Sequence, residues 1–321
     1  MQTLIDFDNA PIFAIPLADG AGTAGVREGM LIEGPQGWGE FSPHPDDHAT
    51  VRWLTAALEP GTVGWPDPVR GRIPIAVTVP AVDPEAAHRI VTQAHCRTAS
   101  VEVGAGVLAA DIARVEAVRD ALGASGTLRC DARGRWDPDA AAAAIPALDV
   151  AAAGLEFVEQ PCRTLPELAA VRRRVNVRIA VDESVRDADD PVRLRLGDAA
   201  DIVVLTCGPL GGARRSLRVA EATELPCVVS SALETSIGLA AGLALAGALP
   251  ELPFACELGT RPLLGGDLVA ASRSLVAVDG YLPVAPMPPA PQPDLLGRYA
   301  LSDPQRAAWW RDRLRAAAAA G

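Results

Sequence analysis

The sequence predicts an α/β protein whose parallel strands close into a TIM-like barrel. From about residue 74 onward, short runs rich in β-branched residues alternate with Ala- and Arg-rich segments of helical period. This alternation is typical of repeated βα units. The runs number eight, as in a closed barrel of parallel strands. In addition, Asp137-Pro138 and Asp190-Pro191 have the form of a helix N-cap followed by proline in the first turn.

Each apolar run is separated from the next by the length of one helix and its loops. We expect strands at IAVTV (75–79), ASVEVG (99–104), TLRCDA (127–132), LEFVEQ (155–160), RIAVDE (178–183), DIVVLT (201–206), PCVVSS (226–231) and PFACEL (253–258). We expect helices between them at 84–94, 109–122, 138–152, 165–174, 191–196, 212–223 and 236–248. The barrel would therefore span residues 74–280.

The two ends of the chain differ in texture from the barrel. Residues 1–73 contain short strand patterns (MLIEG, GWGEF), a polar stretch and a helix near 50–58, which together predict a small α+β capping domain. Residues 281–321 begin with the Pro-rich run PVAPMPPAPQP and end in an Arg/Ala/Trp helix over 304–320. We expect this last helix to return to the cap or to form a dimer contact.

Charge and composition limit the partners. Acidic residues outnumber basic ones by 40 to 29, the net charge is −11, and the pI is near 4.9, so the protein repels nucleic acid and anionic membrane surfaces. The apolar stretch 237–249 is too short to span a bilayer, and the start lacks the zones of a secretory signal. We expect a cytoplasmic protein with a small-molecule substrate, either a monomer or a homo-oligomer.

Two residue counts bear on the chemistry. All 29 residues of the Lys/Arg class are arginine, so the chain contains no lysine. The six cysteines are scattered without a C-x-x-C pair, which predicts buried free thiols rather than disulfides or a zinc ribbon.

Acidic residues close three successive expected strands. Asp131, Glu159 and Asp182 would converge at the barrel mouth, where catalytic groups of such barrels lie. Hard carboxylate oxygens suit Mg²⁺ or Mn²⁺. The alternative is that one or more of them caps a helix or pairs with an arginine.

The sequence resembles the enolase superfamily and, within it, the o-succinylbenzoate synthases of actinobacterial type. The segments that carry the resemblance are VREGMLIEGPQGWGEFSP (26–43), RIPIAVTVPAV (72–82), RCDARGRW (129–136), LEFVEQP (155–161), AVDES (180–184), DIVVL (201–205), PLGG (209–212) and VVSSALETSIGLAAGLALA (228–246). The resemblance implies an α+β cap over a (β/α)₇β barrel, with Asp131, Glu159 and Asp182 as metal ligands. It also implies metal-stabilised removal of a proton next to a carboxylate. Such enzymes dehydrate a cyclohexadiene carboxylate to o-succinylbenzoate on the menaquinone route, and some racemise N-acylamino acids.

The sequence departs from the family where the resemblance places lysines. The Lys-x-Lys pair on the second barrel strand is Ser100-Val101-Glu102 here, and the lysine on the sixth strand is Thr206. Neither serine nor threonine can act as an amine base. Two residues after the first implied metal ligand, where the family usually has asparagine, this chain has Arg133. Its guanidinium could reach the carboxylates and take the place of the metal. Metal binding therefore stays open, and no organic cofactor is expected.

Three functional hypotheses follow. The first is a divergent lyase, isomerase or cyclase that acts on a small metabolite, which could be cyclic, in specialised natural-product biosynthesis. Its catalytic residues would be Glu102 as general base with Arg133, Thr206 and Ser100, and its substrate-binding residues Ser230, Ser231 and Glu234. The second is an o-succinylbenzoate synthase of menaquinone biosynthesis. The third is a non-catalytic protein that binds a ligand or partner, and an arginine that satisfies every acid would favour it.

Overall fold

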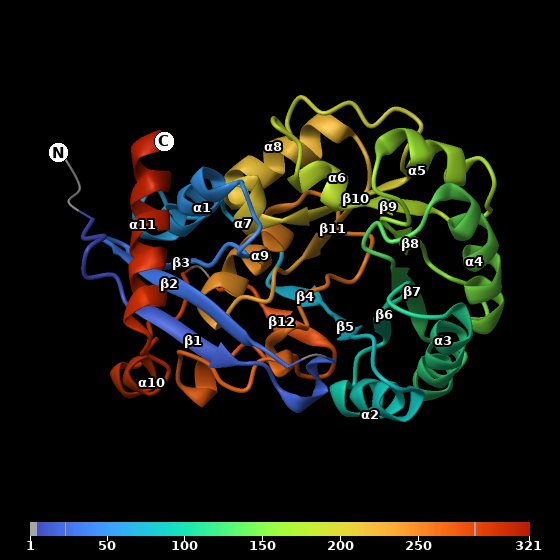
Figure 1. Ribbon diagram of the computed structural model, residues 1–321, viewed down its shortest axis with the longest axis horizontal. Helices are drawn as coiled ribbons and strands as arrows, with labels where there is room; N and C mark the ends of the chain where they lie inside the picture. The colour runs from blue at the N-terminus through green and yellow to red at the C-terminus, as the bar shows by residue number, and fades with distance from the viewer. Residues whose placement is uncertain (1–4, 23, 286) are drawn as a thin grey trace.

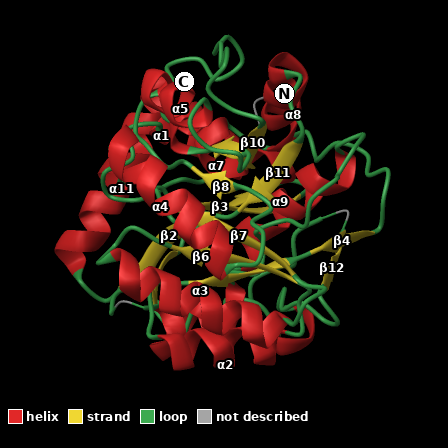
Figure 2. Cartoon of the chain, turned by 90° about the vertical axis from the view of Figure 1, so that its right-hand side faces the viewer, coloured by secondary structure: helices red, strands yellow, loops and turns green. Residues whose placement is uncertain are grey.

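Seven parallel strands form the central sheet, and their order in the sheet is their order in the chain. The computed structural model describes residues 5–22, 24–285 and 287–321. The strands are β5 (Ala76–Val79), β6 (Thr98–Glu102), β7 (Thr127–Asp131), β8 (Val158–Glu159), β9 (Ile179–Val181), β10 (Ile202–Thr206) and β11 (Cys227–Ser230). Figures 1 and 2 show the curled sheet with helices around its outside.

The segment expected as the eighth strand closes the barrel through only two residues. Cys256 bridges to Ile75 beside β5, and Glu257 bridges to Ser230 of β11, both in parallel orientation. The backbone N–H of Glu257 donates to the carbonyl of Val229, and that of Ala76 donates to the carbonyl of Cys256, each at 2.8 Å. The predicted run PFACEL is therefore right in position but much shorter as a strand.

The helices begin where the sequence provides caps. Asp83, Asp137 and Thr164 each accept a backbone N–H of the first turn, and proline follows each of them. The barrel helices are α2 (Pro84–Ala94), α3 (Leu108–Leu122), α4 (Pro138–Ala151), α5 (Leu165–Arg172), α6 (Glu183–Arg186), α7 (Cys207–Leu210), α8 (Ala213–Thr223) and α9 (Ser236–Ala248).

The helix expected at 191–196 is wrong. Asp190 does accept the N–H of Val192, but only a turn follows. The segment PVRLRL alternates apolar and basic residues with a period of two, which does not give a helix a continuous apolar face. The chain instead forms the short helix α6 directly after β9.

The N-terminal part forms the expected cap. Strands β1 (Ile12–Pro16), β2 (Val26–Gly34) and β3 (Gly37–Phe41) make an antiparallel sheet, against which α1 (Thr50–Thr62) and the C-terminal α11 (Pro304–Ala320) pack. Figure 1 shows the red α11 beside the blue cap strands. Trp53 and Trp310 are both buried in this layer. The C-terminal helix therefore lies against elements of the N-terminal part.

Smaller elements complete the chain. Strands β4 (Arg72–Pro74) and β12 (Tyr281–Pro283) pair antiparallel, so the expected domain boundaries near 73 and 280 adjoin in space. The others are η1 (Asp19–Ala21), η2 (Arg261–Leu263), η3 (Ala271–Arg273) and α10 (Pro293–Arg298). The domain boundaries stay a prediction. All six cysteines are buried and free, as expected. In the described part of the chain, every helix is too short or too polar to traverse a bilayer.

Two glutamates of the cap dock onto the N-termini of successive barrel helices. Glu59 of α1 accepts the backbone N–H groups of Ala213 and Arg214 at 2.6 and 2.9 Å. Glu40 of β3 accepts the N–H groups of Thr235 and Gly238 at the start of α9, as well as the Thr235 hydroxyl. Helix N-termini carry unpaired N–H groups and a partial positive charge, so both contacts are favourable.

The approach of Glu59 requires glycine at position 212. Gly212 has φ +102°, a conformation that L side chains rarely adopt, and a Cβ there would lie 2.4 Å from a Glu59 carboxylate oxygen. The PLGG motif therefore serves cap docking.

Glu40 predicts a pH-dependent term in stability. Burial raises its pKa from 4.5 to about 7, although the Thr235 hydroxyl, Arg27 and Ser42 oppose that shift and Glu234 adds to it. Between these two pH values, the folded state holds a proton on Glu40 that the unfolded chain releases. The contribution of Glu40 to the free energy of unfolding is therefore fully present below about pH 4.5 and is lost as the pH rises through 7.

We expect the free energy of unfolding of the native protein to fall relative to that of Glu40→Gln between pH 4.5 and 8, by up to about 3 kcal/mol. Urea unfolding of both proteins across this range measures the difference. Parallel stability curves would show that Glu40 does not titrate in this range. Glu33→Gln, at an exposed position of β2 near its turn into β3, is the matched control.

Candidate functional site

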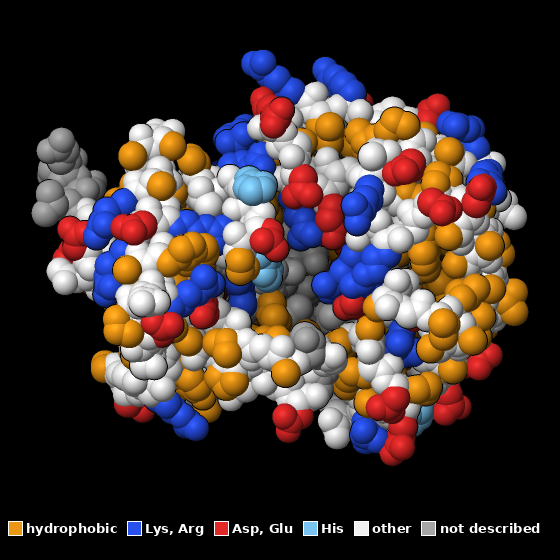
Figure 3. All heavy atoms as spheres, in the orientation of Figure 1, with side chains coloured by type: hydrophobic (Ala, Val, Ile, Leu, Met, Phe, Trp, Pro, Cys, Tyr) orange, Lys and Arg blue, Asp and Glu red, His pale blue; other side chains and the backbone are white. Residues whose placement is uncertain are grey.

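A cavity of about 680 Å³ lies at the carboxyl ends of the barrel strands, under the rim formed by the cap. Figure 3 shows the corresponding hollow, with acidic and basic side chains around it. Seven of its lining residues stand at or near the ends of barrel strands or of the closing segment: Ser100, Glu102, Asp131, Glu159, Asp182, Ser230 and Glu257. This is where the sequence placed the candidate site.

Strand register brings the acids together. Glu102 pairs with Asp131, and Asp131 with Glu159, across β6, β7 and β8. Because side chains alternate along a strand, paired residues point to the same face. Glu257 joins this set from the closing segment, and Asp182 follows β9 directly.

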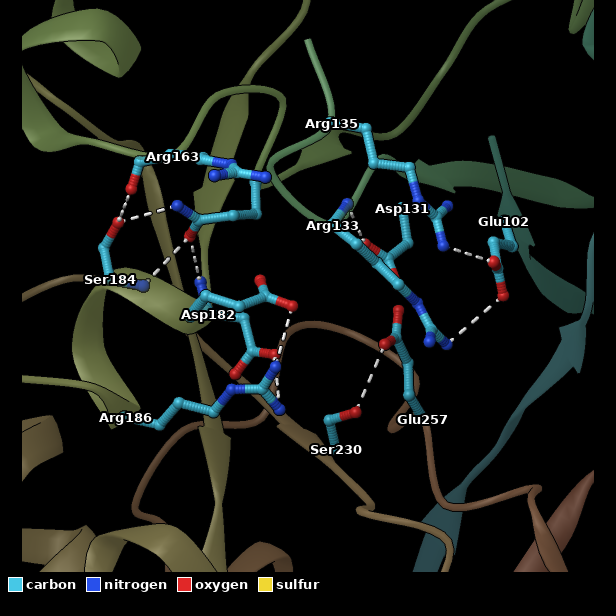
Figure 4. Close-up of polar contacts among 12 residues, drawn as sticks. Glu102, Asp131, Arg133, Arg135, Arg163, Asp182, Ser184, Arg186, Ser230 and Glu257 are labelled. Carbon is cyan, nitrogen blue, oxygen red and sulfur yellow. Dashed lines mark hydrogen bonds and ion pairs between the residues drawn. The ribbon is translucent and has the colours of Figure 1, made fainter. Parts of the chain in front are cut away.

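Arginines enter the same cavity and bind two of the acids. The Arg133 backbone N–H donates to Asp131 Oδ1 at 2.9 Å, and its Nε donates to Oδ2 at 3.2 Å. The guanidinium of Arg133 also lies 3.3 Å from Glu102 Oε2, while Arg135 donates to Glu102 Oε1 at 2.7 Å (Figure 4). Arg133 has φ 50°, so the chain turns sharply after β7 and directs this side chain back over Asp131.

A second acid–arginine group follows β9. Arg186 of α6 lies 3.5 Å from Asp182 Oδ2 and 2.8 Å from Glu183 Oε1 (Figure 4). The fully buried Gln160 fixes the backbone there, because its Oε1 accepts the N–H groups of Asp182 and Ser184. Gln160 thus sets the direction in which Asp182 leaves its strand.

Glu257 stands above a buried cation. Arg129, which is completely buried inside the barrel, lies 3.4 Å from Glu257 Oε1 and also 3.4 Å from Glu156 Oε2. Its guanidinium stacks 4.6 Å from the ring centre of Phe157. Ser230 Oγ donates to Glu257 Oε2 at the long distance of 3.4 Å, and Ser100 also hydrogen-bonds this carboxyl group.

Burial raises the pKa of most cavity acids. Desolvation is the largest cause for Asp131, Asp182 and Glu257, and for Glu159, whose pKa lies well above the usual value. Glu183 rises to about 8 for the same reason, with Asp182 adding repulsion.

Three acids that line the cavity keep buried oxygens without a hydrogen-bond partner: Glu159 Oε2, Asp182 Oδ1 and Glu183 Oε2. Glu159 and Asp182 are only 3% and 7% exposed. The arginines therefore satisfy the ring only in part.

The remaining predicted site residues fall into two groups. Ser231 lines the cavity, but its hydroxyl is already bonded to Glu234 at 2.6 Å and to Thr260 at 2.8 Å. Thr206 and Glu234 do not line the cavity. Helix α7 begins directly after Thr206 and its Pro209 lines the cavity instead, while Glu234 also binds the N–H of Ala232 within its own loop. The placement of Thr206 and Glu234 disfavours direct roles.

Sequence reasoning assigned no role to several charged residues of the cavity, among them Arg135, Arg186 and Glu257. Arg135 and Glu257 were not assigned, although Glu257 ends an expected strand. Arg135 follows Arg133 by two residues, as Arg133 follows Asp131. Arg186 could have been found from its i+4 spacing to Asp182 if the helix after β9 had been expected.

The rim belongs to the cap and is held by arginines. Loop residues His44, Asp46 and Asp47 line the cavity, and Arg313 of α11 donates to the carbonyls of His44 and Asp47 at 2.6 and 2.7 Å. Burial lowers the pKa of His44 to about 4, so its imidazole is neutral at pH 7. Arg52 of α1 similarly binds the carbonyl of Arg186 at 2.7 Å.

A divalent metal ion needs several oxygen or nitrogen ligands directed at one point. Among residues 5–22, 24–285 and 287–321, no group of three His, Cys, Asp or Glu side chains is placed to hold one. Both oxygens of Asp131 are engaged by Arg133. This arrangement does not fit Mg²⁺ or Mn²⁺ at Asp131, Glu159 and Asp182, and it favours the arginine alternative.

Comparisons with known proteins agree with this architecture. Residues 83–291 match the family model described as "Enolase C-terminal domain-like", and residues 12–61 match "Enolase N-terminal domain-like". The o-succinylbenzoate synthase of Thermobifida fusca is 54% identical over 276 residues, covering 85% of this chain and 86% of that protein.

Solved structures share the fold at lower identity. A muconate lactonizing enzyme from Pseudomonas fluorescens, complexed with muconolactone, has a TM-score of 0.77 at 21% identity, covering 94% of this chain and 100% of that one. A dipeptide epimerase from Enterococcus faecalis, complexed with Mg and the dipeptide L-Leu-L-Tyr, has a TM-score of 0.72 at 23% identity, covering 90% of this chain and 98% of that one.

Removing Arg133 should change metal binding. In calorimetric titrations with Mg²⁺ and Mn²⁺, we expect no stoichiometric binding to the native protein. We expect affinity to rise by about tenfold or more in Arg133→Asn, because Asp131 is freed and a positive charge leaves the ring. Adding Asp182→Ala to that variant should abolish the gain. Tight binding to the native protein that Asp182→Ala removes would show that the acids form a metal site despite Arg133.

Proposed function

The chain belongs to the enolase superfamily and is a homologue of o-succinylbenzoate synthases, and on this premise we propose that it is a divergent enzyme of that group. It acts as a lyase, isomerase or cyclase on a small metabolite, which could be cyclic, in the cavity at the barrel mouth. Its acid–base chemistry uses carboxyl groups in place of lysines. We place it in specialised natural-product biosynthesis rather than on the menaquinone route.

The observation that carries the proposal is the partial satisfaction of the acid ring. A non-catalytic descendant would be stabilised by arginines that satisfy every buried acid. Here the cavity persists, and Glu159 and Asp182 keep unpartnered oxygens although both residues are buried. Unpaired buried polar groups reduce stability, and such groups cluster at functional sites.

Glu102 is the proposed proton acceptor. Both of its oxygens bind guanidinium groups, but the contact with Arg133 is longer, at 3.3 Å, than the 2.7 Å contact with Arg135. The Arg133 side chain is also 49% exposed. A substrate therefore displaces Arg133 more readily, which frees Glu102 Oε2 while Arg135 still holds the carboxylate in place. Arg133 then faces the negative charge that develops on the substrate.

Ser230 is the proposed hydrogen-bond donor to substrate. Its only side-chain hydrogen bond in the described structure is the long one to Glu257, so its hydroxyl can turn to a ligand at little loss. Ser100 also hydrogen-bonds Glu257. Ser231, whose hydroxyl is already bonded, orders the loop instead.

The identity of 54% with an o-succinylbenzoate synthase favours a second candidate, retention of that dehydration. Against it stands the absence of every lysine. Positioned acid–base groups contribute about 10²- to 10⁴-fold to such proton transfers. Loss of the amines should therefore leave only a small residual rate.

We expect purified native protein to dehydrate the cyclohexadiene carboxylate at a rate at least about 100-fold below that of the Thermobifida fusca relative. Absorbance of the aromatic product, measured side by side, gives both rates. A variant with Ser100→Lys, Glu102→Lys and Thr206→Lys is the matched control and should exceed the native rate. A native rate within about tenfold of the relative would establish the second candidate instead.

Proton abstraction by Glu102 predicts solvent exchange. In D₂O, we expect the native protein to place deuterium next to the carbonyl or carboxyl group of at least one compound in a panel of small cyclic and acyclic acids. NMR follows the exchange, and Glu102→Gln should slow it by about 100-fold. Glu33→Gln, in the cap, should leave it unchanged. No exchange across the panel would favour the non-catalytic hypothesis.

A further inference from the structure

The strongest unexplained feature of the cavity is its excess of acidic residues over arginines. Nine acidic residues line it against three arginines, and the neutral His44 adds no compensation. The buried Arg129 adds one positive charge below Glu257. The acids are Asp46, Asp47, Glu102, Asp131, Glu159, Asp182, Glu183, Asp187 and Glu257.

We infer that the cavity binds a small molecule that carries an ammonium group, and that Glu159 and Asp182 are its main contacts. This inference rests on the proposed function, because it names the class of substrate for the same site. It departs from the cyclohexadiene carboxylate that the family resemblance implies as substrate. The ammonium group supplies positive charge to a cavity that has no lysine and whose arrangement does not fit Mg²⁺ or Mn²⁺.

The position of the ammonium group follows from the free acceptors. Arg133 and Arg135 hold Glu102, and Arg133 also holds Asp131. Arg186 reaches Asp182 Oδ2 and leaves Asp182 Oδ1 without a partner. Glu159 Oε2 also has no hydrogen-bond partner. An ammonium group has three N–H donors and can serve acceptors that approach from different strands. A planar guanidinium is restricted to one plane.

A second carboxylate near the group adds to this environment. Glu257 faces the same space as Asp131, Asp182, Arg133 and Arg186 (Figure 4), and its only cationic partner in the described structure is Arg129, at 3.4 Å from below. A dianionic ligand placed there would bring only acceptor oxygens to a space lined by the acceptor oxygens of Glu159, Asp182 and Glu257. An ammonium group would instead bring N–H donors to the same three groups.

A matched set of probes tests the inference. Cyclohexylammonium, cyclohexanecarboxylate and cyclohexanol have nearly the same shape and differ in charge. We expect cyclohexylammonium to bind to the native protein in calorimetric titrations at least about tenfold more tightly than either of the other two. Its affinity should fall as salt is added, because the attraction is screened.

Neutralising the two acids should remove this preference. Glu159→Gln and Asp182→Asn should each weaken cyclohexylammonium binding by about tenfold. Asp139→Asn, which removes one exposed negative charge far from the cavity, should leave it unchanged. Thermal midpoints measured for each variant show that it is folded, so a loss of binding is assigned to the site.

Several results would overturn the inference. They are tighter binding of cyclohexanecarboxylate, no binding of any probe, or cyclohexylammonium binding that neither variant changes. If Mg²⁺ binds to the native protein in the absence of the probes and Asp182→Asn abolishes that binding, the free oxygens belong to a metal site. These outcomes leave the proposed enzyme intact, because deuterium exchange that depends on Glu102 tests it separately.

Discussion

The removal of several carboxylates from water at one end of the barrel is the constraint on which the site depends. Parallel strands in register place Glu102, Asp131 and Glu159 next to one another. Burial and the neighbouring acids both oppose the ionisation of Asp131 and Glu159. The arginines offset the cost of burying these carboxylates only for the acids that they contact, because each guanidinium is bound to the acids nearest to it. The charge that remains determines what the cavity can accept.

The cap contributes to the same site by fixing its rim. Glu59 and Glu40 bind the N-termini of α8 and α9, which sets where the cap sits on the barrel. From that position, Arg313 holds the rim loop that contains His44 and Asp47. Residues distant in the chain therefore cooperate in one enclosure, which explains why α11 belongs structurally to the first part of the chain.

Local sequence signals were enough to predict the barrel, most of its helices and the strand-end acids. Strand spacing and the helical period between strands are local properties, so α2 and α9 were predicted at their observed bounds. Pairings across the barrel could not be predicted, because Arg135 reaches Glu102 over 33 residues and Arg129 reaches Glu257 over 128. The helix expected at 191–196 failed because its cap signal was present without a helical apolar face. The sequence showed that lysines were missing, but the arginine partners of the acids became evident only in the structure.

The two-residue eighth strand has a consequence for the order of folding. Its bridge between Cys256 and Ile75 joins the first and last parts of the barrel, whereas strands β5 to β11 pair only with their neighbours in the chain. Contacts between such distant segments require the largest loop closure and form late. Glu257 lies on this closing segment beside Ser230 of the preceding strand, and it meets Arg129 of β7 only when the circle of strands is complete. An incompletely folded barrel therefore has its acids in water, and the cavity arises only with the final closure.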